Sequence, residues 1–207
     1  MHYAFKSTAM IRLVIMGAHI WFLIVAKILF LYSIMLPQKT FDPLTGETSA
    51  AYVLRMQENY LPDWPPEVLD SWLYFGHGLP TLFNTLDLTK LSFTKHIWRK
   101  EDIPGEEIVG SNWRFKDEMR SIDHYFVNSG KYWIADYMLE HGTWNTGIII
   151  LENRNPERQL KTGYGEVLKQ PYHLLEGHNR LTILNRLIEL GKAADEHEVW
   201  IAQLAES

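Results

Sequence analysis

The chain has 207 residues, of which 46% are hydrophobic and 22% charged, a composition typical of a globular protein with one medium domain. It contains no cysteine, which excludes disulfide bonds, thiolate metal sites and a cysteine nucleophile, and which suits a reducing compartment. Its net charge of −5 disfavours extended DNA binding, because such surfaces depend on many lysine and arginine contacts to phosphates. A small phosphate ligand held at one local site is compatible with this charge.

An apolar stretch at residues 11–36 is the first long feature of the chain, and it is long enough to span a bilayer. Lys27 lies inside the stretch, where its charge is costly unless it is paired or reaches the membrane surface. Three interpretations stay open: a membrane anchor, a helix buried against the domain, or a translation start placed upstream of the real one at Met35. The expected location is therefore cytoplasmic, or membrane-anchored with the side of the domain undetermined.

Residues 37–90 predict a helical N-terminal region that follows a turn-rich linker. The pattern of residues 47–60 predicts a helix capped by Thr45 or Ser49. A second helix is expected to start at Pro65 and Pro66, which the first turn tolerates, and to continue through residue 75. We expect these helices to offer a surface to a protein partner.

Residues 91–207 predict an α+β domain. Strands are expected at residues 91–98, 146–151, 172–175 and 197–204, and helices within 112–140 and after residue 180. The 146–151 run is continuously apolar, which is typical of a strand covered on both faces. Residues 152–170 predict a loop. This order of elements indicates a mixed sheet with helices packed against it.

A short turn of sequence EGHNR, residues 176–180, joins the third predicted strand to the helix that follows it. Gly177 lets the backbone turn sharply and leaves the first amides of the helix pointing outward. These amides and the positive end of the helix dipole favour the binding of a phosphate. Arg180 suits bidentate binding of the same anion. Glu176 has three equal interpretations: a general base, a ligand of phosphate-bound Mg²⁺, or a residue favoured by the helix dipole.

Three further residues are candidates near this turn. His178 could hydrogen-bond phosphate, act in acid–base chemistry or serve only the structure. Asn179 is interpreted first as a helix cap, because asparagine side chains accept hydrogen bonds from early helix amides. Glu101 follows the first strand of the domain, where its carboxylate could reach the pocket as a base or metal ligand; a solvated turn is the simpler interpretation.

The segments HGTWNTGIIILENRN, YHLLEGHNRLTILNRLIELGK and HEVWIAQL resemble the ParB/sulfiredoxin-like domain superfamily, over roughly residues 91–204. In that superfamily a strand ends in a Gly-x-x-Arg turn that opens a helix, and the EGHNR turn is most similar to the Asp-Gly-His-His-Arg of a free-serine kinase branch. The resemblance implies a mixed sheet flanked by helices and a pocket for ATP or CTP. It places Gly177 and the backbones of His178 and Asn179 against phosphate, Arg180 on phosphate oxygens, and Asn145 near the pocket wall.

The chain departs from the superfamily at two positions. His178 stands where sulfiredoxins have cysteine, and the second arginine of the ParB turn is absent. We therefore expect a nucleotide-dependent phosphotransferase or NTPase, assisted by Mg²⁺ through Glu176 or Glu101, with Glu176, His178 and Glu101 as catalytic candidates. The alternative is a non-catalytic switch module that binds a nucleotide or a nucleic-acid end. A DNA-processing role is the weakest expectation, because the net charge is negative.

Overall fold

The computed structural model describes residues 46–75, 86–110, 115–127, 130, 132–155, 157, 159–161 and 165–205. The chain divides into two compact units, Met1–Pro37 and Gln38–Ser207, and every described residue belongs to the second. The apolar stretch at residues 11–36 lies outside the described residues. Within the described part of the chain, no helix is long and apolar enough to cross a membrane.

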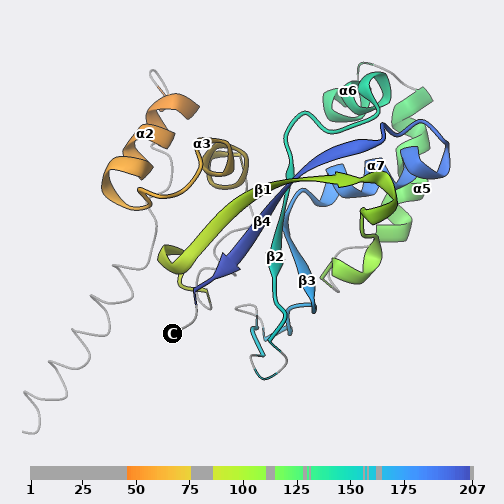
Figure 1. Cartoon of the computed structure of the whole chain (residues 1–207). Coiled ribbons are helices and arrows are strands. Elements are labelled where there is room, and N and C mark those ends of the chain that lie inside the picture. Colours follow the sequence, from red (N-terminus) through yellow and green to blue (C-terminus); the bar gives the residue numbers. More distant parts are fainter. Residues whose placement is uncertain are drawn as a thin grey trace, which may run out of the picture. The chain divides into compact units, whose positions relative to one another are not determined.

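Four strands form one mixed sheet in the order β1-β4-β2-β3 (Figure 1). Their bounds are Leu91–Arg99 for β1, Ile148–Glu152 for β2, Tyr172–Glu176 for β3 and Glu196–Leu204 for β4. β4 pairs antiparallel with β1 and parallel with β2, and β2 pairs antiparallel with β3. The starts of β2 and β4 therefore lie at the same end of the sheet as the ends of β1 and β3.

The inner strand β2 is apolar on both faces. Its four residues Ile148, Ile149, Ile150 and Leu151 are fully buried, which confirms the prediction of a strand covered on both sides. Side chains alternate between the two faces of a strand, so helices that pack on one face contact only every second side chain. Ile148 and Ile150 belong to the main apolar core together with Val199 and Ile201 of β4.

Three helices supply most of the rest of this core: α5 at Phe115–Val127, α6 at Trp133–His141 and α7 at His178–Glu189. Figure 1 shows them gathered around one end of the sheet. Each helix buries one apolar face, and in α7 Leu181, Leu184 and Leu187 lie three residues apart, as the sequence predicts. The buried members are Phe115, Ile122, Ala135, Met138, Leu181, Ile183, Leu184 and Leu187.

Glycines end two of these helices. Gly142, with φ +68, is the C-cap of α6, and its amide donates to the carbonyl of Met138. Gly191, with φ +66, follows α7, and the amide of Lys192 donates to the carbonyl of Leu187. Left-handed φ values favour glycine, so both helix ends predicted from the sequence are confirmed.

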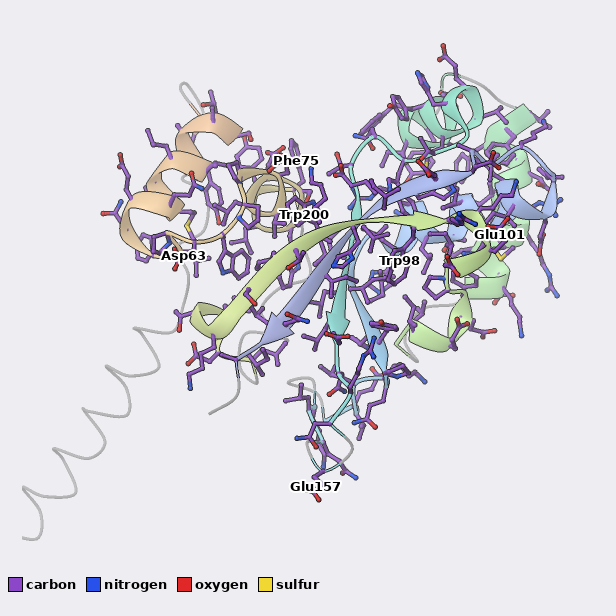
Figure 2. The ribbon with its side chains drawn as sticks, viewed as in Figure 1. Asp63, Phe75, Trp98, Glu101, Glu157 and Trp200 are labelled. Atoms are coloured by element: carbon purple, nitrogen blue, oxygen red, sulfur yellow. The ribbon has the colours of Figure 1, made fainter. Side chains whose placement is uncertain are left out.

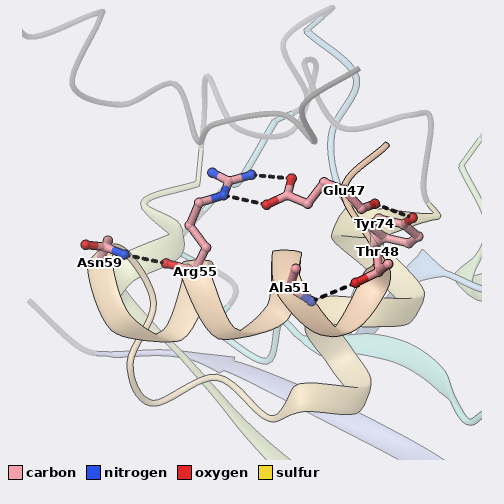
Figure 3. A network of polar contacts seen from close by, with 6 residues as sticks. All are labelled: Glu47, Thr48, Ala51, Arg55, Asn59 and Tyr74. Atoms are coloured by element: carbon pink, nitrogen blue, oxygen red, sulfur yellow. Dashed lines mark hydrogen bonds and ion pairs between the residues drawn. The ribbon is translucent and has the colours of Figure 1, made fainter. Parts of the chain in front are cut away.

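The helical N-terminal region consists of α2 at Ser49–Asn59, a short α3 at Pro66–Val68 and a π-helical turn, η1, at Leu69–Tyr74. Figure 3 shows how Glu47, just before α2, ties the segment together: its carboxylate accepts two hydrogen bonds from Arg55, and its carbonyl accepts one from Tyr74. The side chain of Thr48 caps α2 by accepting from the amide of Ala51, so the predicted cap, Thr45 or Ser49, was wrong. Thr45, Thr48 and Ser49 all carry hydroxyl groups that can cap a helix, and sequence alone does not rank them.

Aromatic rings join this region to the sheet. Trp64 stacks on Trp72 with ring centroids 5.4 Å apart, and Phe93 of β1 meets the Trp64 ring edge-on at 4.6 Å. The indole nitrogen of Trp64 also donates to the carbonyl of Leu88. Trp72 is 1% exposed and is thus part of the packing between the two segments.

Short 3-10 turns complete the described elements, at Leu88–Lys90 (η2), Lys100–Asp102 (η3) and Glu106–Ile108 (η4). Glu152, where the predicted loop begins, is the last residue of β2; in the described part of residues 153–170 the only β pairing is one bridge between Lys161 and Val167, which agrees with a loop there. The described chain is thus an α+β structure with a four-stranded mixed sheet and flanking helices, as the sequence predicts.

Candidate functional site

Gly177 sits where β3 turns into α7, in a backbone conformation that only glycine adopts easily. Its φ is +101, and a Cβ built on it would lie 2.5 Å from Cγ2 of Ile148 in the neighbouring strand β2. Both the left-handed φ and the close approach require glycine here. Gly177 is the N-cap of α7, and no side-chain hydrogen bond caps the helix at that residue. The positive end of a 12-residue helix therefore opens at this turn.

Arg180 is buried in the first turn of α7 and is bonded to protein groups. One terminal nitrogen donates to the carbonyl of Thr146, just before β2, at 2.7 Å, and the other donates to the carboxylate of Glu176. Arg180 is only 8% exposed. Burial raises the pKa of Glu176, and the Arg180 guanidinium acts against that rise. Arg180 thus ties the end of β3 to the loop that enters β2.

His178 and Asn179 line the mouth of the same turn. Burial lowers the pKa of His178 to about 4, so its ring is neutral at pH 7. Asn179 is exposed to solvent, and its side chain hydrogen-bonds the hydroxyl of Tyr132, which precedes α6. Asn179 is the second residue of α7 rather than its cap, so its interpretation as a cap was wrong.

Two residues that sequence reasoning missed stand beside the turn. Burial raises the pKa of the Tyr132 hydroxyl. His173 in β3 is 5% exposed; burial lowers its pKa to about 4, the positive charges of His178 and Lys169 lower it further, and Glu166 acts in the opposite direction. Tyr132 lies more than forty positions before Asn179 in the printed sequence, and no local pattern links the two. His173 stands at an inward position of a predicted strand, which was the available signal for its burial.

Asn145 is exposed in the loop that Arg180 holds, one residue before Thr146. The loop is close to β4 as well, because a Cβ on Gly147 would lie 2.8 Å from the carbonyl oxygen of Glu198. The structure therefore brings Asn145, Glu176, Gly177 and Arg180 to one end of the sheet.

Glu101 does not belong to this group. It lies beyond the end of β1 (Figure 2), in a polar groove of about 400 Å³ lined by Arg99, Glu101, Asp195 and Glu196. The sheet register gives the separation of the two glutamates. Glu176 of β3 lies across β2 from Trp200 of β4, whereas Arg99, two residues before Glu101, pairs with Glu196 at the start of β4. With about 3.3 Å per residue along a strand and about 4.8 Å between strands, Glu101 is on the order of 20 Å from Glu176.

No cluster of three histidine, aspartate or glutamate side chains suitable for a metal ion occurs among the described residues. Glu176 is therefore not part of such a cluster in the described chain. Mg²⁺ is commonly bound in proteins by one or two carboxylates together with phosphate oxygens and water, an arrangement that the single Glu176 carboxylate would suit.

No family model, no curated protein and no solved structure matches this chain.

Proposed function

We propose that residues 91–204 form a nucleotide-binding domain of the ParB/sulfiredoxin-like type, which holds phosphate at the turn from Glu176 to Arg180. The observation that carries this proposal is the β3–Gly177–α7 junction: a left-handed glycine opens a 12-residue helix with no side-chain cap. Such a helix N-terminus presents amides and a positive dipole end to an anion. The mixed sheet with flanking helices supports the same proposal.

The backbone amides of His178 and Asn179 are the proposed phosphate donors. His178 contributes hydrogen bonding rather than charge, because its ring is neutral at pH 7. Asn179 and Asn145 are exposed polar side chains on either side of the turn, and both offer donors to a nucleotide.

Arg180 has a more specific part in this proposal than a simple clamp. One terminal nitrogen contacts Thr146 and the other contacts Glu176, so a phosphate that takes over the second of these donors replaces the Glu176 carboxylate. That exchange frees Glu176 at the moment the nucleotide binds. A freed carboxylate next to phosphate then acts as a base or completes the coordination of Mg²⁺, which is the enzymatic version of the proposal, a phosphotransferase or NTPase.

The second candidate is a switch module that binds a nucleotide without turning it over. The ion pair between Glu176 and Arg180 favours this version, because the guanidinium occupies the carboxylate that would otherwise act as a base or bind a metal ion. The separation of Glu101 from the turn favours it too, because the second carboxylate that the sequence suggested for catalysis lies elsewhere.

A panel of ATP, ADP, CTP and GTP, each with Mg²⁺, tests the proposal by thermal unfolding and by phosphate release. A nucleotide present at 100 times its dissociation constant stabilises the folded chain by about 2.7 kcal/mol. Release of phosphate supports the enzyme, and stabilisation without release supports the switch. If no nucleotide stabilises the chain, the proposal is wrong.

The variant Asn179→Asp tests the position of the site. It places a negative charge at an exposed residue in the first turn of α7, where an aspartate favours the helix but repels phosphate. We expect the nucleotide affinity to fall at least tenfold while the fold keeps its stability. Asn155→Asp is the matched control, because Asn155 is exposed in the 152–170 loop and its side-chain oxygen still accepts from Glu157. An equal effect of both variants contradicts the assignment.

A further inference from the structure

The edge strand β1 carries a second feature that the nucleotide site does not explain. β1 lies at the outer edge of the sheet, with β4 on its only paired side among the described strands. Its four central residues, Thr94, Lys95, His96 and Ile97, are all exposed. Ile97 is 59% exposed, which is unusual for a large aliphatic side chain in a nine-residue strand.

The hydrogen-bond pattern shows which backbone groups of β1 point outward. The amide of Lys100 donates to the carbonyl of Asp195, and the amide of Ala205 donates to the carbonyl of Lys90. In an antiparallel pair the bonded positions alternate, so even-numbered residues of β1 face β4 and odd-numbered residues face away. The outward amides and carbonyls of Phe93, Lys95 and Ile97 have no backbone partner within the described residues.

The opposite edge of the sheet is protected in ways that β1 is not. β3 has five residues, Pro171 directly precedes it, and its pairing with β2 shifts register between Ile149 and Ile150. Short strands, prolines and bulges are devices that prevent edge-to-edge pairing. β1 has nine residues, no proline and a continuous register with β4.

Lys95 is the one charge at the middle of β1, and carboxylates outnumber it. Its ammonium nitrogen lies 3.1 Å from Glu198 and 3.7 Å from Glu67. One ammonium between two carboxylates leaves a negative charge uncompensated, so a second ammonium at the same place is attracted rather than repelled. The usual protective effect of an edge lysine is therefore cancelled here.

We propose that two copies of this chain pair antiparallel through β1, about a two-fold axis at Lys95, to make a continuous eight-stranded sheet. In this register Lys95 faces the partner's Lys95, with four carboxylates around the two ammonium groups. Phe93 faces the partner's Ile97, so the exposed Ile97 of each copy gains an apolar contact. Moving the axis to Ile97 instead places Lys95 opposite the partner's Arg99, which sets like charges against each other.

Single cysteines test this register directly, because the 207-residue chain has none of its own. In a hydrogen-bonded antiparallel pair the Cα atoms of facing residues are about 5.5 Å apart, within disulfide range. With copper phenanthroline as oxidant, Lys95→Cys is expected to give a covalent dimer on a non-reducing gel. Ile97→Cys, whose copies lie about 13 Å apart in the proposed register, is expected to remain monomeric on the same gel.

Leu54→Cys is the control for chance collisions, because Leu54 is similarly exposed on α2 at 56%. A covalent dimer from Ile97→Cys or Leu54→Cys that equals the yield from Lys95→Cys overturns the proposal. So does the absence of any crosslink from Lys95→Cys.

A pair of proline variants tests the backbone part of the interface. Ile97→Pro removes an outward amide and leaves the β1–β4 ladder intact, so the chain is expected to unfold as the wild type does but to lose at least tenfold in dimer affinity by sedimentation. His96→Pro removes an amide that faces β4 and is expected to destabilise the monomer itself. A wild-type chain that sediments as a monomer at every concentration, or an Ile97→Pro dimer of unchanged affinity, contradicts the proposal.

Discussion

Gly177 shows how one residue decides both the shape and the chemistry of the turn. A side chain at this position is opposed twice, by the left-handed φ of +101 and by Ile148 within 2.5 Å. The glycine is thus needed for folding whether or not a phosphate ever binds. Its presence in the sequence was correctly interpreted as a turn, but that presence alone cannot separate structure from function.

The substitution Gly177→Ala is expected to lower the free energy of unfolding by about 3 kcal/mol or more, because backbone strain and a clash with β2 add together. Gly191→Ala is the matched control: its φ is +66, and a Cβ there meets nothing within 4 Å. Only the backbone cost of about 1 kcal/mol applies to the control. Urea unfolding of both variants checks the difference, and equal losses contradict it.

Arg180 and Glu176 form a pair whose partners depend on each other. Arg180→Ala leaves the Glu176 carboxylate in a place where burial already raises its pKa, and it frees the carbonyl of Thr146. We expect a loss of about 2–4 kcal/mol, below the full cost of breaking a buried pair because the Glu176 side chain is 26% exposed. Arg186→Ala is the control on the same helix, where Arg186 binds Asp123 at the surface and the loss stays within about 1 kcal/mol. Chemical denaturation that gives similar losses for both arginines refutes this prediction.

At the scale of elements, the sequence predicted nearly every described strand and helix because each one has a local signal. The apolar run of β2, the spacing of leucines in α7 and the glycines at 142 and 191 all act within a few residues. What the sequence could not provide is the pairing between distant segments. Nothing local shows that β4 enters between β1 and β2, or that Tyr132 reaches Asn179.

The candidate site was predicted in the same uneven way. The turn and its helix were found, and the loop of Asn145 does lie beside them. The burial of Arg180 was missed, because an arginine three residues after a glycine looks the same in sequence whether its guanidinium faces solvent or a carbonyl. Glu101 was grouped with the turn because it follows a strand, whereas the sheet order sets it apart.

The strand β3 and the loop before it share a dependence on pH. His173 accepts a hydrogen bond from the amide of Lys169 through Nδ1, and a doubly protonated ring cannot accept that bond. Its pKa in the folded chain is about 4, below the ordinary 6.5, so the folded state resists protonation. This part of the stability is complete above about pH 6.5 and is lost as pH falls through 4.

We expect His173→Gln to reduce the acid sensitivity of folding, since glutamine still accepts from Lys169 but does not titrate. The difference in unfolding free energy between the two proteins should change by about 2–3 kcal/mol from pH 7 to pH 4. Urea unfolding at several pH values measures it. Parallel pH profiles for the wild type and His173→Gln argue against a neutral buried ring.

For the molecule as a whole, the turn and the β1 edge are separate features of one sheet. The turn lies where β3 ends, whereas the open edge lies on the far side of β4 and β2. Loss of dimerisation therefore leaves nucleotide binding unchanged in our proposals, and the Ile97→Pro variant can be used to separate the two. Nucleotide binding that vanishes together with dimerisation points to a site shared between copies.

The place of β4 in the sheet also sets when the protein can fold during synthesis. β4 follows the other three described strands in the chain, yet it occupies an inner position. Among the described strands, β1 is hydrogen-bonded to the sheet through β4 alone. Leu91, at the start of β1, pairs with Leu204, so it has no strand partner until residue 204 has been synthesised. While the ribosome is still making residues 196–204, the nascent chain can form the β2–β3 hairpin but must carry β1 unpaired. Such long-range closure is slow, so strand edges that are prone to aggregation stay exposed until the last strand is made.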